Sequence, residues 1–243
     1  MCNPTVTMVL PAHNEAAWLE GEARDLSRRA RETLPDLAWD VLIVENGSTD
    51  DTARVASSLA DGDERITAMH LERASYGSAL KEGIARARGD VVALFNVDLW
   101  DLQFLAEALE LLNECDLVIG SKLARGGGDR RPIVRRLISR ALNSLLRAAF
   151  GFDGTDTHGM KAFWRDKIAP LAAECVTDGE VFDTEFVLRA QRAGLRVREL
   201  PVVVQEKRPA RTGLFRRGQR AIRELGRLWI ALRREDADTT GHG

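Results

Sequence analysis

The chain has 243 residues, of which 44% are hydrophobic and 30% charged, and its formal net charge is -2. This composition excludes a disordered or fibrous protein and is typical of one α/β domain. No apolar run approaches the roughly 20 residues that cross a bilayer, and nothing at the N-terminus resembles a signal peptide. The three cysteines are widely spaced and odd in number. We therefore expect a reduced, cytoplasmic protein.

Apolar, β-branched runs alternate with amphipathic segments along the chain, which predicts strands alternating with helices. The expected strands cover residues 5–10, 41–44, 66–71, 91–95, 117–119, 160–164 and 197–204. The expected helices cover residues 16–33, 52–59, 76–88, 102–113, 133–150, 182–193 and 214–234. Such alternation implies βαβ units and a largely parallel sheet, with Pro201 marking an edge or a bend.

We expect an α/β domain over residues 1–213, a basic amphipathic helix over 214–234 and a disordered tail over 235–243. From Lys207 to Arg234 there are ten Lys/Arg residues and a single acid, Glu224. Such a helix has two interpretations. It lies at a membrane surface through its basic and apolar faces, or its apolar stripe of Leu225, Leu228, Trp229 and Leu232 packs on the sheet.

Polar residues follow three of the expected strands, in the segments PAHNE, ENGSTDDT and FNVDLWD. In an open α/β sheet, ligands bind outside the carboxyl ends of the strands. Asn96 and Asp98 are therefore placed to hold a charged ligand or its metal ion. The alternative is that Asp98 or Asp101 caps the helix that begins near Leu102.

These segments together resemble the inverting family 2 glycosyltransferases of the GT-A nucleotide-sugar fold, nearest to the polyprenyl-phosphate (dolichyl-phosphate) mannose and glucose synthases. The matching motifs are P-x-[YH]-N-E at 11–15, V-D-D-x-S-x-D-x-T at 44–52, A-x-G-D at the end of 77–90, D-A-D-L-Q at 96–100, I-G-S-[RK] at 119–122, F-D-x-E at 182–185 and E-[LIV]-P-V with a basic loop at 199–211. The resemblance spans nearly the whole chain and implies a single GT-A domain.

The resemblance also implies the site residues. Nucleotide-sugar binding would involve Pro11, His13, Glu15, Val44, Glu45, Asn46, Asn96, Val97, Asp98, Lys122, Lys207, Arg208 and Arg211. Asp98, with Asn96, would hold Mg²⁺ or Mn²⁺. The catalytic candidates are Asp98, Asp156, His158, Asp183 and Glu185, with helix capping or salt bridging as the alternative for Asp156, Asp183 and Glu185.

The chain departs from the family pattern in three places, which involve four residues. Asn96 replaces its first metal-binding Asp, Trp100 replaces its Gln, and Glu45-Asn46 replaces its Asp-Asp pair. An amide oxygen is a neutral ligand, so we expect a weakened metal site.

The expected function is transfer of a hexose from a GDP- or UDP-sugar to a polyprenyl phosphate. A lipid phosphate is already an anion and needs no general base, whereas a hydroxyl acceptor would need one. Three alternatives stay open: a small-molecule or carrier-bound acceptor, a transferase that binds its donor without turnover, and a nucleic-acid-binding module. The basic segments lack interleaved aromatics, which disfavours the last, so we expect no nucleic acid partner.

Overall fold

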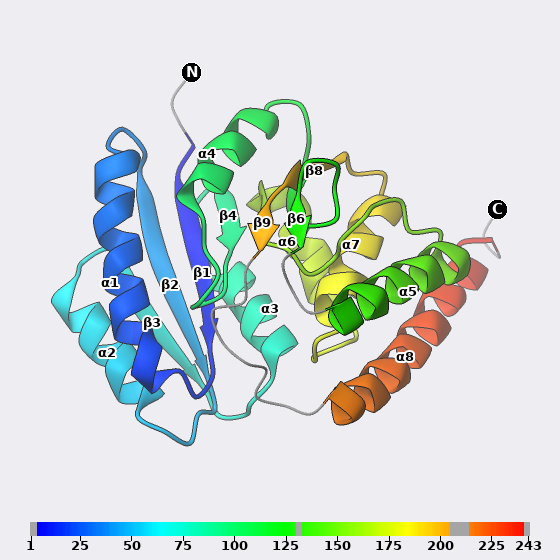
Figure 1. The fold of residues 1–243 in the computed structure, drawn as a ribbon, viewed down its shortest axis with the longest axis horizontal. Coiled ribbons are helices and arrows are strands. Elements are labelled where there is room, and N and C mark those ends of the chain that lie inside the picture. Colours follow the sequence, from blue (N-terminus) through cyan, green and yellow to red (C-terminus); the bar gives the residue numbers. More distant parts are fainter. Residues whose placement is uncertain (1–3, 130–132, 205–213, 241–243) are drawn as a thin grey trace.

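A seven-stranded sheet with the strand order β3-β2-β1-β4-β7-β5-β8 forms the centre of the protein (Figure 1). The computed structural model describes residues 4–129, 133–204 and 214–240. The strands of the sheet are β1 (Val6–Ala12), β2 (Trp39–Asn46), β3 (Ile66–Leu71), β4 (Val91–Leu94), β5 (Leu117–Ser121), β7 (Lys161–Trp164) and β8 (Val197–Pro201). A second, two-stranded sheet pairs β6 (Gly128–Asp129) with β9 (Val203–Val204).

Strand pairing is parallel except at β7, which runs antiparallel to both β4 and β5. The predicted, largely parallel sheet is therefore confirmed. Because β7 runs the other way, the residues that precede it lie at the edge where β4 and β5 end. The register shows this directly, since Lys161 at the start of β7 pairs with Leu94 of β4 and Ile119 of β5.

Helices cover both faces of the sheet. They are α1 (Ala16–Thr33), α2 (Thr52–Gly62), α3 (Tyr76–Arg86), α4 (Leu102–Leu111), α5 (Ile133–Phe150), α6 (Arg165–Glu174), α7 (Phe182–Arg192) and α8 (Leu214–Thr240). Buried side chains of α1, α2 and α4 share one apolar cluster with the sheet, and those of α3, α6 and α7 share another. The central strand β1 supplies side chains to both clusters, as expected of a strand covered on both faces.

Two elements differ from the predictions. The sequence did not predict α6, because Pro170 lies inside it and proline disfavours a helix interior. Packing overrides that preference, since Ile168 and Ala172 of α6 are buried in the second cluster. The expected strand 197–204 is two strands, β8 and β9, and β8 is the edge strand that Pro201 predicted.

The prediction of a disordered tail is wrong for residues 235–240, which continue α8. Glu235 accepts two hydrogen bonds from the Arg189 guanidinium, at 2.9 and 3.1 Å, and Asp236 pairs with Arg192. These partners lie on α7, so the sequence around the tail could not reveal them. Residues 241–243 lie outside the described part of the chain.

None of the helices in the described ranges combines the length and the apolarity that a bilayer-crossing segment requires.

Candidate functional site

The segments after β1 and β2 are joined by hydrogen bonds. The His13 Nδ1 atom lies 2.9 Å from the carbonyl oxygen of Asn46, and the Asn46 side-chain amide donates to the carbonyl oxygen of Ala12 at 3.3 Å. The Glu15 backbone N–H donates to the Thr52 hydroxyl at 2.7 Å. Pro11 and Val44 are paired in the register and buried beneath this edge. The structure thus brings together the residues predicted to line the nucleoside.

Glu45 has a structural partner on each side. Its carboxylate accepts the Ser48 backbone N–H at 2.6 Å and lies 3.3 Å from Nδ1 of His70 on β3. The turn between Glu45 and Ser48 needs Gly47, which has a φ of +60°. A Cβ atom added to Gly47 would lie 2.6 Å from the backbone nitrogen of Ala74. Glu45 therefore stabilises this turn, and its contact with a nucleotide stays a prediction.

The segment after β4 forms a tight turn between Asn96 and Leu99, whose backbones exchange two hydrogen bonds of 3.1 Å. The turn buries Val97 and leaves Asn96 and Asp98 partly exposed. Because β4 is the parallel neighbour of β1, this turn lies at the same edge of the sheet as His13 and Glu15. The described residues contain no group of three or more His, Cys, Asp or Glu side chains that could hold a metal ion by themselves. Metal binding by Asp98 and Asn96 would therefore need oxygen ligands from the substrate, and it stays a prediction.

Two neighbours of Asp98 have other partners. Asp101 is the N-cap of α4 and accepts the backbone N–H groups of Gln103 and Phe104. The Trp100 indole N–H donates to Glu22 of α1 at 2.9 Å. The capping alternative is therefore right for Asp101, whereas the contact of Asp98 with a metal ion or a nucleotide sugar stays a prediction.

Lys122 follows β5 and forms a buried ion pair with Asp156, in the segment before β7. Burial raises the pKa of the Asp156 carboxyl, but the attraction and hydrogen bond of Lys122 prevail, so its pKa is lowered below the usual 3.8. Asp156 is consequently ionised at neutral pH and already paired. It holds Lys122 at the edge where β4 and β5 end, and it is a poor candidate for a general base.

His158 is the better candidate for a base in this segment. The packed chain on one side of the ring lowers the pKa of its imidazole below 6.5, outweighing the attraction of Asp183 and Asp156, while the residue keeps an exposed surface toward solvent. The ring is thus neutral near pH 7, and its Nδ1 lies 2.9 Å from the Thr157 hydroxyl. A neutral imidazole at the end of the sheet could take a proton from a hydroxyl acceptor.

Asp183 forms a buried ion pair, as its salt-bridging alternative predicted, but its partner is Lys161, which the sequence did not predict. Its Oδ1 accepts from the Lys161 ammonium at 2.6 Å, and its Oδ2 accepts from the Tyr76 hydroxyl at 3.2 Å. Lys161 is 1% exposed and also donates to the carbonyl oxygen of Gly159. A lysine in a sequence is expected to be exposed, because lysine is almost never fully buried unless it is paired. The sequence therefore carries no signal for this pair. Asp183 serves the packing of β7 against α7 and α3.

The structure removes Glu185 from the candidate bases. Its fully buried carboxylate accepts the backbone N–H groups of Val176 and Thr177, the Thr177 hydroxyl and the Arg189 guanidinium, at 2.7 to 2.8 Å. The salt-bridging alternative is therefore right for Glu185. Lys207, Arg208 and Arg211 lie outside the described residues, so their predicted contacts with a diphosphate stay predictions.

Comparison with known proteins gives the relatives of this chain. It is 36% identical over 216 residues to the Glycosyltransferase AglD of Haloferax volcanii, covering 87% of this chain and 35% of the relative. It is 26% identical to the Dolichyl-phosphate beta-glucosyltransferase ALG5C of Trichomonas vaginalis, and the match covers 81% of this chain and 62% of the relative. It is 27% identical to the Undecaprenyl-phosphate mannosyltransferase of Micrococcus luteus, covering 83% and 84%. The chain thus spans about a third of the first relative and under two thirds of the second.

Solved structures share the fold. Glucosyl-3-phosphoglycerate synthase from Mycobacterium tuberculosis, in complex with Mn²⁺, UDP and glucosyl-3-phosphoglycerate, superimposes with a TM-score of 0.69 at 24% identity, covering 93% of this chain and 80% of that one. Mannosyl-3-phosphoglycerate synthase from Rubrobacter xylanophilus superimposes with a TM-score of 0.64 at 19% sequence identity, and the match covers 97% of this chain and 75% of that one. The predicted GT-A architecture is confirmed by these likenesses.

The family profile described as Glycosyl transferase family 2 matches residues 7–169, which is well over half of the chain. The matched stretch contains every strand end described above, from His13 to Lys122, and the segment before β7 that holds Asp156 and His158. The chain belongs to glycosyltransferase family 2.

Proposed function

We propose that this chain transfers a hexosyl group, with inversion, from a GDP- or UDP-sugar to a polyprenyl phosphate. The observation that carries the proposal is the gathering of His13, Asn46, Asp98 and Lys122 at one edge of the sheet, from four different strand ends. Two relatives are named for transfer to dolichyl phosphate and undecaprenyl phosphate, which supports this class of acceptor.

The residues divide the work of such a reaction. His13 and Asn46 would hold the nucleoside, while Asp98 and Lys122 would flank the diphosphate. Asp98, with Asn96 beside it, would hold Mg²⁺ or Mn²⁺, and the bound ion neutralises the charge that builds on the departing diphosphate. Lys122 adds a positive charge whose position Asp156 fixes. Fixed charges of this kind favour the transition state because they need no rearrangement during the reaction.

A phosphate acceptor needs no proton removed, so His158 would bind or position it. A small-molecule acceptor with a hydroxyl group is the second candidate, and His158 would then act as the base. The solved structures of glucosyl- and mannosyl-3-phosphoglycerate synthases share the fold and support keeping this candidate.

Contact with a membrane surface belongs to the same proposal, because a polyprenyl phosphate is a membrane lipid. On this proposal the protein acts at the cytoplasmic face of the membrane. The structure changes which residues of α8 could make the contact. Leu228 and Leu232 are buried in the second apolar cluster, as the packing interpretation predicted. Trp229, Ile222 and Ile230 are 39%, 71% and 49% exposed and supply the outward apolar surface.

Nucleotide binding is tested by thermal unfolding with GDP, GDP-sugars, UDP and UDP-sugars. A ligand at 100 times its Kd adds about 2.7 kcal/mol to the free energy of unfolding, which raises the Tm of a domain of this size by about 5–10 °C. We expect this rise for one of the two bases, and we expect EDTA to reduce it.

The Asn96→Asp variant is the matched test of the metal site. A second carboxylate beside Asp98 should lower the Mn²⁺ concentration that gives half of the nucleotide-dependent rise in Tm. An unchanged Mn²⁺ dependence in Asn96→Asp, together with no effect of EDTA on the native chain, would argue against a metal at this turn.

A further inference from the structure

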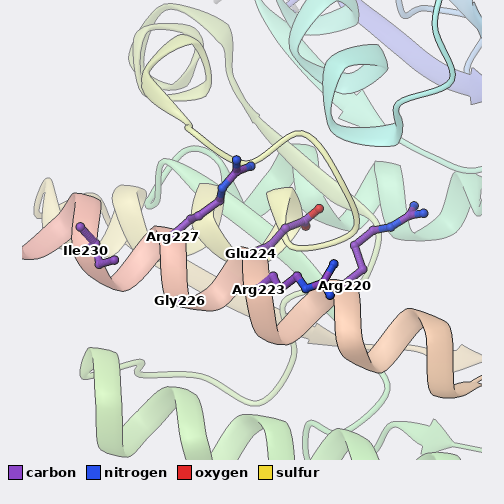
Figure 2. Close-up of a pocket in the computed structure, with 6 residues that line it drawn as sticks. All are labelled: Arg220, Arg223, Glu224, Gly226, Arg227 and Ile230. Carbon is purple, nitrogen blue, oxygen red and sulfur yellow. The ribbon is translucent and has the colours of Figure 1, made fainter.

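An arginine-lined hollow of about 570 Å³ lies along α8 (Figure 2). Its lining residues are Arg220, Arg223, Glu224, Gly226, Arg227 and Ile230. Arg220, Arg223 and Arg227 are spaced by three and four residues, so they share one side of the helix. Figure 2 shows the arginine side chains extending from the side of α8 that faces a neighbouring loop.

The three arginines have no carboxylate partner among the residues that the structure describes. The arginines of α1 do have one, such as Arg24 with Glu20 and Arg28 with Glu32. Three like charges on one helix side repel each other. The hollow is therefore an electropositive concavity to which a bound anion would add charge-assisted hydrogen bonds.

Glu224, the acid within the hollow, is engaged elsewhere. Its Oε2 accepts the backbone N–H of Val181 at 3.3 Å. A Cβ atom on Gly179 would lie 2.2 Å from its Oε1, so the carboxylate lies directly against the loop between α6 and α7. Glu224 thus attaches α8 to this loop and leaves the guanidinium groups available.

The same loop reaches the proposed nucleotide site. The carbonyl oxygen of Asp178 accepts from the Gly77 backbone N–H and from the Ser75 hydroxyl, both at 2.7 Å. The Ser75 backbone N–H in turn donates to Asn46 Oδ1 at 3.2 Å. Only the loop and the start of α3 therefore separate the hollow from Asn46.

We propose that Arg220, Arg223 and Arg227 bind a phosphate group at a site separate from the nucleotide site. The planar guanidinium binds phosphate oxygens in pairs, which makes arginine the usual residue for this ligand. The group can belong to a polyprenyl phosphate, to an anionic phospholipid headgroup or to a soluble phosphate. Exposed Ile222 and Ile230 flank the arginines on α8, which is the pattern of a helix that meets lipid.

The test compares the native chain with the triple variant Arg220→Gln, Arg223→Gln, Arg227→Gln. Binding is measured by co-sedimentation with phosphatidylcholine vesicles that contain either phosphatidylglycerol or polyprenyl phosphate, and by thermal shift with inorganic phosphate. The triple variant is expected to bind the relevant probe about 100-fold more weakly, because each basic residue near an anionic surface contributes about fivefold. Each single substitution should therefore cost about fivefold, which keeps the test available if the triple variant fails to fold.

A second triple variant, Arg24→Gln, Arg28→Gln, Arg29→Gln on α1, is the matched control. It removes the same charge from exposed, ion-paired arginines of another helix and should bind like the native chain. Weakening confined to one probe supports the site and identifies the source of the phosphate. Equal binding by the native chain and the α8 variant, equal weakening in the α1 control, or no binding of any probe by the native chain would overturn it. These measurements need no sugar transfer, so they stand apart from the proposed activity.

Discussion

Replacing Asp98 by asparagine is expected to lower the rate of sugar transfer by about 100- to 1000-fold. The carboxylate lies at the turn after β4, at the edge where β1 and β2 also end. On the proposed function, removing its charge would weaken the binding of a divalent ion beside Asn96 and would leave Lys122 alone to compensate the charge of the departing diphosphate. The loss should appear in kcat, because this charge matters most when the leaving group separates.

The Asp101→Asn variant is the control for this prediction. It removes a carboxylate three residues away, and asparagine caps a helix about as well as aspartate. It should therefore keep both the Tm and the rate of the native chain. Release of nucleoside diphosphate measures the rate in each variant. A similar rate in the two variants would contradict the role of Asp98.

Breaking the buried pair between Lys161 and Asp183 is expected to have the largest effect on stability. Asp183→Asn leaves an ammonium group, 1% exposed, with the Gly159 carbonyl as its remaining partner. Removing one partner of a buried ion pair typically costs about 3–5 kcal/mol. For a domain of this size the Tm should fall by about 10 °C or more. Thermal unfolding at neutral pH measures it.

The double variant Lys161→Met, Asp183→Asn distinguishes the interaction between the two charges from the contacts that each side chain makes with its other neighbours. Once both charges are absent, no unpaired charge stays buried, so the double variant should be more stable than Asp183→Asn alone. Strictly additive losses would show that the two residues act independently. The same variants test the candidate role of Asp183 as a catalytic base. If Asp183 were the base, Asp183→Asn would lower the rate of sugar transfer far more than Lys161→Met, at temperatures where both variants are folded.

The strands and their polar ends could be predicted from the sequence because both signals are local. A fully buried strand such as β1 is an apolar run interrupted only by Thr7, and the polar residues that follow it, such as His13 and Glu15, mark the edge of the sheet. Placing Asp98 beside them needed only the general rule that parallel strands end at one edge.

The parts that could not be predicted depend on contacts between distant segments. Lys161 is buried because Asp183, 22 residues later, lies against it. Glu235 is ordered because Arg189 of α7 reaches it, although the tail itself reads as polar and unstructured. Glu185 has the residue type of a catalytic base, and only its backbone partners at Val176 and Thr177 identify it as structural.

Transfer of a sugar from each of a panel of GDP- and UDP-sugars, in the presence of Mn²⁺, to either polyprenyl phosphate or 3-phosphoglycerate tests the central claim most directly. The proposed function predicts a glycosylated polyprenyl phosphate from one donor, with the anomeric configuration opposite to that of the donor by NMR. Transfer to 3-phosphoglycerate alone, or a product that keeps the donor's configuration, would contradict it.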